Sequence, residues 1–449
     1  MSEVEIPKIS VVDGRYRELV GDFRKLATDE NYYSTRVQIE IAWLICVMEH
    51  ISVSTDEIWK NYKYDDLEQT ICDLKQWLSS SHNTSEMYKN IRMIEKKTRH
   101  DVKAIEYYIR EFVQVKYHNL IHICLTSQDI NSVAFTIILK KQCDYMVNKL
   151  EKFVSDISFM KDFNVPYMQR THGQKAVGGC LGRFIEKFII KIKSEIPKLV
   201  QAKNSLTSKF SSSTGDYSTL LLGFGTIDVI HSKQKRMCEL LNVDIIFNDD
   251  ARQIDDYTSY VELAQVYMMI SMKIQEFCTQ IWLMIRSDNL VQKKIDGEIG
   301  SSVMPQKINP WSLEQSWAIF SEIVSGLQNV SKCLSSSFDA RDMSDSVTMR
   351  FFQDKIALLV IAITNITDTF KIIQPNVEFC EYEVVSYPAS KGELLQTYLR
   401  IMNYQGDPYK ECADFLKGRK VTGEQWNCFV DSYECLTSEQ KKKIYSYES

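Results

Sequence analysis

Hydrophobic residues recur with helical spacing through the middle of the chain. Between Leu139 and Met160 they alternate in steps of four and three residues, which is typical of a helix packed nearly parallel to its neighbours in a bundle. A second helix is predicted over Leu181 to Leu206, in which Pro197 would introduce a kink or an early end. A third, from about Tyr257 to Ile285, is apolar around much of its circumference and therefore belongs in the interior of an assembly.

Two further helices are predicted over Trp311 to Leu334 and Phe351 to Ile372. No alternating strands with hairpin turns are expected between Ile121 and Ile372. The pattern therefore predicts an all-α fold in three parts: an N-terminal helical domain over residues 1–112, a central long-helix bundle over 113–372, and a small C-terminal helical domain over 373–449.

Composition supports long helices and excludes several classes of function. The 449 residues include only 16 Gly and 8 Pro, so breaks are few. The net charge of −5 is spread without long blocks of one sign, which argues against a nucleic-acid partner. The amino terminus lacks the layout of a signal peptide, and the most apolar run, "ALLVIAI", is too short to span a membrane. We therefore expect a soluble, cytoplasmic protein without a membrane partner.

The cysteines and histidines give no metal-binding pattern. Twelve cysteines are scattered along the chain without Cys/His ligand spacing, so we expect free thiols and no metal. Lone histidines such as His50, His82 and His231 are expected to be structural or on the surface.

Five polar segments interrupt the helical pattern and carry candidate chemistry: "VVDGRY", "TRHDVKAIEYYI", "CLTSQDIN", "QRTHGQKA" and "GEIGSSVMPQKINP". The last offers backbone amides, hydroxyls and a lysine in one loop, which suits a carboxylate or a developing oxyanion. Together with a histidine to move protons, this indicates acid-base chemistry on an anionic substrate. Bundles build such sites from groups on several helices.

Each of these segments also has a purely structural explanation. Thr126, Ser127 and Asp129 could cap the helix that follows them, because their side-chain oxygens can accept from free amides of the first turn. In the same way, Ser301 and Ser302 could cap the helix that begins near Trp311. Residue types alone leave both interpretations open.

The segment "GSSVMPQKINP" resembles the signature of the fumarase/aspartase superfamily, Ser-Ser-x-Met-Pro-x-Lys-x-Asn. The stretches "VVDGRY", "RHDVKAIEYYI", "TSQDIN" and "RTHGQ" resemble the adenylosuccinate lyase family of bacterial type, and "ARDMSDSVTMR" resembles that family's phosphate-binding segment. The resemblance covers nearly the whole chain. It implies a homotetramer built around long helices, with each active site shared between three subunits and no cofactor.

The reaction implied by the resemblance is the elimination of fumarate in purine biosynthesis, from adenylosuccinate to give AMP and from SAICAR to give AICAR. The resemblance makes Ser301 the general base and His172 the general acid, while His100 orients the substrate or assists proton transfer. A serine base requires a stabilised alkoxide, for which the loop amides and Lys307 are the candidates. The substrate-binding residues implied are Arg15, Tyr16, Asp101, Thr126, Ser127, Thr171, Gln253, Ser302, Met304, Lys307, Asn309, Arg341, Ser346 and Arg350.

The chain departs from the family pattern at several positions. Lys175 stands where proline is common, Gln128 where glutamate is frequent, and Gln306 where histidine or tyrosine is usual, and "FDARD" lacks a tryptophan and an arginine found in bacterial relatives. There are three alternatives to this function: an argininosuccinate lyase, a non-catalytic relative with a structural role, and a helical bundle that only binds nucleotides. The arginine-rich stretches argue against the first, and the presence of the proposed base and acid argues against the second.

Overall fold

The computed structural model describes residues 9–294, 297, 301 and 303–446. The chain divides into two compact units. Unit 1 comprises Met1–Leu150, Glu195–Met272 and Ala318–Thr364, and unit 2 comprises Glu151–Ser194, Lys273–Trp317 and Asn365–Ser449. The three predicted domains are not tested by this division and stay a prediction.

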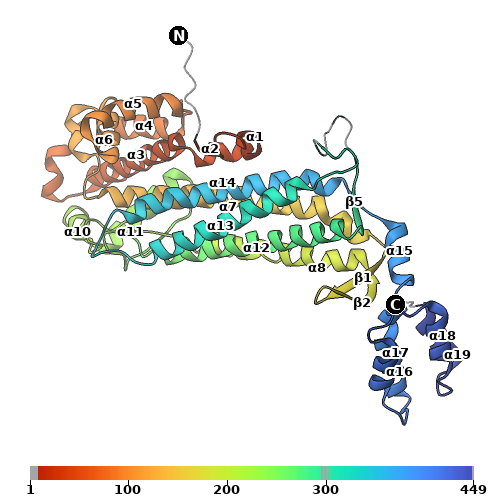
Figure 1. The fold of residues 1–449 in the computed structure, drawn as a ribbon. Coiled ribbons are helices and arrows are strands. Elements are labelled where there is room, and N and C mark those ends of the chain that lie inside the picture. Colours follow the sequence, from red (N-terminus) through yellow and green to blue (C-terminus); the bar gives the residue numbers. More distant parts are fainter. Residues whose placement is uncertain (1–8, 295–296, 298–300, 302, 447–449) are drawn as a thin grey trace. The chain divides into compact units, whose positions relative to one another are not determined.

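Four long helices dominate the fold, and each contributes residues to both units (Figure 1). They are α7 (Ser127–Ile157), α12 (Thr258–Arg286), α13 (Trp311–Leu334) and α14 (Ser344–Lys371). The bounds of α13 are those predicted from the hydrophobic pattern, and those of α12 differ by one residue at each end. Helix α14 begins at Ser344, earlier than the predicted start at Phe351. The prediction started too late because the first turn of the helix is polar and shows no helical spacing of apolar residues.

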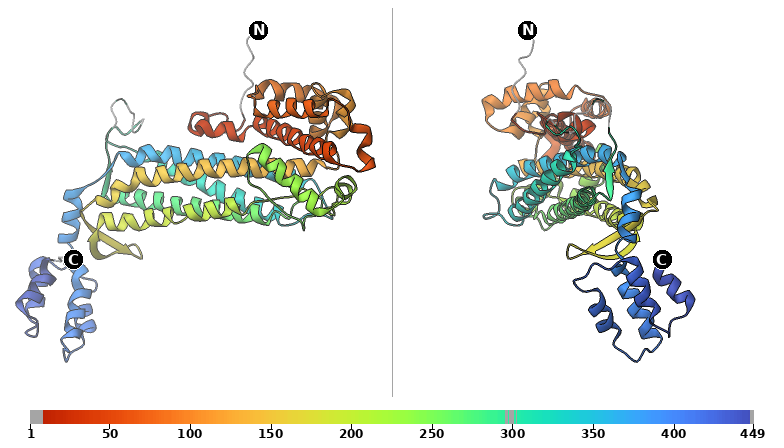
Figure 2. Two further views of the ribbon diagram at one scale, coloured as in Figure 1. Left: turned by 180° about the vertical axis from the view of Figure 1, so that it is seen from behind. Right: turned by 45° about the vertical axis from the view of Figure 1, so that its right-hand side comes forward.

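Aromatic side chains join the long helices within unit 1. The Tyr267 hydroxyl on α12 donates to Cys143 Sγ on α7 over 3.4 Å, and its ring meets Phe352 on α14 edge-on. All three residues are fully buried. The unit 1 segments of α7, α12 and α14 consequently run side by side, as the views in Figures 1 and 2 show.

Helix α3 (Asp29–Val53) forms the centre of the amino-terminal part of unit 1. The Thr28 hydroxyl caps it by accepting from the Asn31 amide over 3.2 Å, and Asp29 lies in the first turn, where negative charge is favourable. The helix packs against α4 (Leu67–Ser79), α5 (Thr84–Thr98), α6 (Asp101–Arg110) and α11 (Ile227–Leu241). It is therefore buried on most sides.

The remaining elements of unit 1 are short. They are α1 (Arg17–Val20), α2 (Arg24–Ala27), α9 (Ile196–Asn204), α10 (Ser218–Phe224) and the parallel pair β3 (Thr207–Ser208) and β4 (Ile246–Phe247). The helix predicted over Leu181 to Leu206 is interrupted, and Pro197 lies in the first turn of α9. The early end predicted from this proline is confirmed.

Unit 2 contains a hairpin that the sequence interpretation missed. Strands β1 (Pro166–Thr171) and β2 (Gln174–Cys180) pair antiparallel with a bulge near Gln169. The expectation of no hairpin between Ile121 and Ile372 is therefore wrong. Tyr167 and Met168 are adjacent buried residues of β1, and β2 contains two glycines, so neither strand has the alternation of apolar residues that identifies a half-buried strand.

An aromatic core holds the bundle part of unit 2. Phe277 on α12 stacks on Phe370 of α14 at 5.0 Å, and Phe188 of α8 (Leu181–Lys193) and Phe153 of α7 pack around them. A short antiparallel pair joins β5 (Leu290–Gln292) to β6 (Ile373–Pro375).

The carboxy-terminal elements of unit 2 have a hydrophobic cluster of their own, which includes Leu399, Trp426, Val430 and Ile444. The helices are α15 (Val377–Val385), α16 (Gly392–Ile401), α17 (Pro408–Leu416), α18 (Gly423–Asp431) and α19 (Ser438–Ser446).

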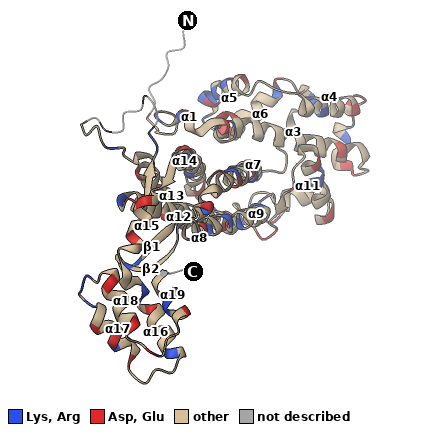
Figure 3. Cartoon of the chain, turned by 90° about the vertical axis from the view of Figure 1, so that its right-hand side faces the viewer, with Lys and Arg blue, Asp and Glu red and all other residues tan. Residues whose placement is uncertain are grey.

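Charged residues of both signs are interspersed along the helices (Figure 3). Among the residues that the structure describes, no helix has the length and apolar character needed to cross a membrane. All twelve cysteines are free, and six of them are buried.

Candidate active site

The first turn of α7 carries a buried ion pair. The carboxylate of Asp129 accepts from the Thr126 amide over 2.7 Å and from the Thr126 hydroxyl over 3.0 Å. It also lies 2.6 Å from Lys209 Nζ, which in turn donates to the Thr126 hydroxyl oxygen over 3.3 Å. Thr126 is thus held by Asp129 and Lys209, while its predicted contact with a substrate stays a prediction.

Burial lowers the pKa of Lys209, and the Asp129 carboxylate opposes that shift. The positive charge of Arg341, a predicted phosphate ligand, also lowers the pKa of Lys209. Arg341 is therefore close enough to act on the charge of the Lys209 and Asp129 pair. Sequence analysis did not identify Lys209, because the segment "SKFSSS" does not show that its lysine is buried.

Gln128, Tyr257 and Asp345 form a second buried group. The amide of Gln128 lies 2.6 Å from the Tyr257 hydroxyl and 3.2 Å from Asp345 Oδ2, and the Tyr257 hydroxyl donates to the same carboxylate oxygen over 2.8 Å. Three chain segments meet here: the start of α7, the loop before α12 and the first turn of α14.

Arg36 on α3 connects the α7 segment to the helix that His100 opens. Its guanidinium lies 2.6 Å from Asp101 and 3.3 Å from Asn131, and it stacks on the rings of Tyr32 and Tyr33. Burial would raise the pKa of Asp101, but Arg36 outweighs this and lowers it. Arg36 is fully buried, and sequence analysis did not identify it.

His100 is the N-cap of α6, as expected of a residue that opens a helix. Its Nδ1 accepts from the Lys103 amide over 3.2 Å and lies 3.7 Å from Asp101 Oδ1. The exposed side chain of His100 leaves Nε2 available for a substrate.

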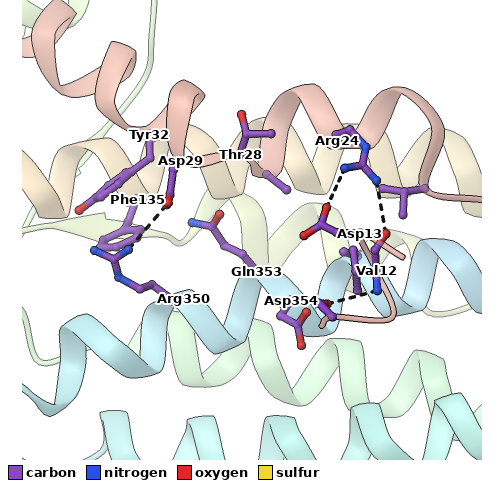
Figure 4. Close-up of a pocket in the computed structure, with 14 residues that line it drawn as sticks. Val12, Asp13, Arg24, Thr28, Asp29, Tyr32, Phe135, Arg350, Gln353 and Asp354 are labelled. Atoms are coloured by element: carbon purple, nitrogen blue, oxygen red, sulfur yellow. Dashed lines mark hydrogen bonds and ion pairs between the residues drawn. The ribbon is translucent and has the colours of Figure 1, made fainter. Parts of the chain in front are cut away.

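A cavity of about 460 Å³ opens beside the amino-terminal segment of unit 1 (Figure 4). Arg350 from α14 lies 3.6 Å from Asp29 at the start of α3, and Arg24 pairs with Asp13 over 2.7 Å. Tyr32 and Phe135 form part of the wall, and their rings stack. The cavity therefore combines aromatic surface with two arginines and is bounded by the "VVDGRY" segment.

Other predicted substrate-binding residues lie in the same unit. Arg15 is exposed, and Tyr16 precedes α1. Gln253 and Arg341 lie in two loops that the Arg252 guanidinium connects by donating to the Asp339 carbonyl over 2.9 Å. Ser346 is part-buried in the first turn of α14, one residue after Asp345.

Thr171 and His172 lie at the tip of the hairpin in unit 2. Thr171 pairs with Gln174, so His172 and Gly173 form a two-residue turn, with φ values of 52° and 74°. Two positive φ values are the signature of a type I′ turn, for which glycine at the second position is favoured. The turn leaves His172 exposed to solvent.

Lys175 accounts for one departure from the family pattern. It lies 3.2 Å from the buried carboxylate of Glu383 on α15, which also binds Arg170 of β1, and its ammonium packs over the ring of Tyr387. This residue therefore ties the turn end of the hairpin to α15.

The signature loop in unit 2 places Ser301 at a backbone turn. Its hydroxyl oxygen accepts from the Met304 amide over 3.0 Å and more weakly from the Val303 amide over 3.5 Å. The proposal that Ser301 caps α13 is therefore wrong, since that helix begins at Trp311. Met304 and Lys307 are exposed and Asn309 is part-buried, whereas Ser302 lies outside the described residues.

The predicted site residues thus form two groups. His100, Asp101, Thr126, Ser127, Gln253 and the predicted phosphate ligands belong to unit 1, whereas Thr171, His172, Ser301, Met304, Lys307 and Asn309 belong to unit 2. Within unit 1, buried side chains join three of the predicted stretches. Arg36 contacts Asp101 and Asn131, and Tyr257 contacts Gln128 and Asp345.

Comparison with known proteins shows the family of the chain. A family model described as lyase matches residues 14–325, and a model described as adenylosuccinate lyase C-terminal matches residues 337–448. The chain belongs to this lyase family. The predicted place in the fumarase/aspartase superfamily and the predicted lyase class are both confirmed.

Relatives of this lyase match over nearly its full length. The adenylosuccinate lyase of Haemophilus influenzae is 24% identical over 444 residues, covering 97% of this chain and 94% of the relative. That of Buchnera aphidicola is 27% identical over 447 residues, covering 97% and 93%. A crystal structure of a fumarate lyase from Mesorhizobium sp. BNC1 has a TM-score of 0.72 at 13% identity, covering 98% of this chain and 95% of that one, and supports the fold alone.

Proposed function

We propose that this lyase is an adenylosuccinate lyase that eliminates fumarate from adenylosuccinate, to give AMP, and from SAICAR, to give AICAR. The observation that carries the proposal is the match of residues 337–448 to the adenylosuccinate lyase C-terminal model. That region contains Arg341, Ser346 and Arg350, the candidate ligands of a nucleotide phosphate. Arginine suits this role because its planar fork makes bidentate contacts with phosphate.

In the proposed mechanism Ser301 removes a proton from the carbon beside the succinyl carboxylate. The electron pair of that C–H bond forms the fumarate double bond, and the C–N bond breaks. The Met304 amide supports this role, since a hydrogen bond to Ser301 Oγ stabilises the alkoxide form of the serine. Lys307 adds a positive charge to the same loop.

His172 gives a proton to the departing nitrogen, which leaves neutral in AMP or AICAR. Its position at the tip of an exposed turn suits a residue that reaches into a site completed by other groups. His100 orients the substrate through its free Nε2.

The intermediate carries a doubly charged aci-carboxylate, so fixed donors must meet charge that forms only during the reaction. Lys307 and Asn309 supply these donors from the signature loop, together with Thr126, Ser127 and Thr171. In the structure the Thr126 hydroxyl donates to Asp129 and accepts from Lys209, so to take this role it turns its proton from Asp129 to the substrate.

We further propose a homotetramer in which each site takes residues from more than one subunit. Exposed aromatic side chains on the long helices support subunit contacts: Trp311 is 51% exposed and Trp317 48%. Trp317 also borders a groove of about 250 Å³ in unit 2 with Trp282 and Leu313. Twelve free thiols suit the reducing conditions of the cytoplasm, where we place the enzyme.

The proposal is tested by mixing the purified protein with adenylosuccinate and, separately, with SAICAR, and measuring loss of the succinyl nucleotide together with appearance of fumarate. Ser301→Ala prepared identically is the control for lyase carried over from the expression host. Release of fumarate from both substrates is expected. Turnover of argininosuccinate alone would refute the substrate assignment, and a folded oligomer inert toward all three would point to a non-catalytic relative.

A further inference from the structure

Gln128, Tyr257 and Asp345 form a polar group that makes none of the proposed substrate contacts. Their exposed fractions are 2%, 2% and 4%, so all three side chains are shielded from solvent. Asp345 Oδ2 accepts from the Gln128 amide over 3.2 Å and from the Tyr257 hydroxyl over 2.8 Å. Among the described residues, Asp345 Oδ1 is buried and has no hydrogen-bond partner.

Each member of this group adjoins a proposed substrate-binding residue. Gln128 directly follows Thr126 and Ser127, Tyr257 lies in the loop that carries Gln253, and Asp345 directly precedes Ser346. The three hydrogen bonds therefore tie the nucleotide-binding segments of unit 1 to one another.

Asp345 determines which way the first turn of α14 faces. Arg350 lies four positions after Ser346, so these two residues share one face of the helix. Fixing the side chain of Asp345 in the interior fixes the rotation of the turn and hence the direction of that face. If the side chain of Asp345 were not held, Ser346 and Arg350 would no longer be directed to the same place.

The neutrality of Gln128 is important here. The family frequently carries glutamate at this position, but in this chain a glutamate would set a second carboxylate about 3 Å from Asp345 Oδ2 in the protein interior. Two carboxylates so close cannot both be ionised without a large penalty. The other charges nearby are Asp255, two residues before Tyr257, and the Asp129 and Lys209 pair.

We propose that Gln128 is a positioning residue whose amide, together with the Tyr257 hydroxyl, holds Asp345 and thereby directs Ser346 and Arg350 toward the substrate phosphate. The inference rests on the proposed function, because it assigns a task to the phosphate ligands of that site. It adds an interaction between the α7 and α14 segments that the resemblance does not include.

The test compares Gln128→Glu and Tyr257→Phe with the wild-type protein in the binding of AMP and of adenosine, measured by titration calorimetry. Adenosine lacks the phosphate and serves as the internal control. We expect both variants to bind AMP about tenfold more weakly, the effect of one lost hydrogen bond to a charged group, with adenosine binding unchanged. For Gln128→Glu the loss should grow as pH rises and the added carboxylate ionises.

Gln142→Glu is a matched control variant. Gln142 is a fully buried amide on the same helix and donates to the Leu26 carbonyl over 3.2 Å. Its substitution also buries a carboxylate and should lower the melting temperature, but should leave AMP affinity at the wild-type level.

Two outcomes would overturn the inference: wild-type AMP affinity in both Gln128→Glu and Tyr257→Phe, or equal weakening of AMP and adenosine, which would indicate general loosening of the fold. These binding results do not depend on turnover. Failure of the wild-type protein to release fumarate would count against the proposed function, while a selective loss of AMP binding would still support the role of Gln128.

Discussion

Lys209 Nζ lies 2.6 Å from Asp129 Oδ1, and both side chains are completely buried. Asp129 also accepts hydrogen bonds from the amides of Thr126 and Ser211, so protein donors replace the water that its carboxylate loses on burial. Lys209 has a single anionic partner among the described ion pairs. The arrangement fixes Thr126 at the start of α7. Each of the two buried charges is compensated by the other, so removal of one leaves the other without a counter-charge.

Removing Lys209 should therefore destabilise the protein strongly. Lys209→Met leaves the Asp129 charge buried without its cation, and we expect a loss of about 3–5 kcal/mol in the free energy of unfolding. The double variant Lys209→Met/Asp129→Asn removes both charges and should recover part of that loss. Urea denaturation of the three proteins measures the difference. Equal stability of wild type and Lys209→Met would show that the pair does not hold the segment.

The turn at the tip of the β1–β2 hairpin gives a second prediction. Gly173 has φ 74° and nothing within 4 Å of the place of a Cβ, so Gly173→Ala meets backbone strain but no steric clash. We expect a loss of about 1 kcal/mol in stability. Because the turn orients His172, we also expect kcat to fall by about ten- to a hundredfold.

Gly418 offers a matched control for that substitution. It also has φ 74° and open space at the Cβ position, but it follows α17 and adjoins none of the proposed site residues. Gly418→Ala should lower stability by a similar amount and leave kcat unchanged. A similar fall in kcat for both variants would mean that strain alone, and not the position of His172, explains the loss.

The apolar pattern predicted the existence of α7, α12, α13 and α14, but not the connections between site residues. The bounds of α12 and α13 follow from a hydrophobic period that runs the whole length of each helix. The hairpin was missed because its strands do not alternate apolar and polar residues, and the sequence instead suggested a break. Lys209, Arg36 and Asp345 were missed for another reason: their burial depends on partners far away in the chain, and a single sequence shows charge but not its environment.

The pair of His122 and Glu40 predicts a pH dependence of stability. Burial would lower the pKa of His122, but Glu40, whose carboxylate lies 2.6 Å away, outweighs this effect and raises the pKa above 6.5, with smaller contributions from Glu106 and Asp129. A raised pKa means that the folded state binds the proton more tightly than the unfolded state. The stabilisation is therefore complete at pH values below 6.5 and is lost as pH rises through the raised pKa.

Unfolding by urea between about pH 5.5 and 9 measures this slope. In His122→Gln the loss of stability with rising pH should be smaller than in the wild type. His231→Gln is the control, because His231 also lies near a carboxylate, Asp249 at 3.3 Å, but its side chain is 41% exposed and screened by water. If His122→Gln kept the wild-type slope, the pH dependence would have to come from other groups.

Mixing two inactive variants tests whether sites are shared between subunits. Ser301 belongs to unit 2 and His100 to unit 1, so Ser301→Ala and His100→Ala damage different units of the chain. If a site takes these residues from different subunits, random mixing restores both intact residues in about a quarter of the sites. We therefore expect activity to appear when the two proteins are unfolded together and refolded, with two affinity tags used to isolate mixed oligomers. Each variant refolded alone should stay inactive. Mixed oligomers without activity would mean that both residues of a site come from one chain, because each chain would then lack one of them.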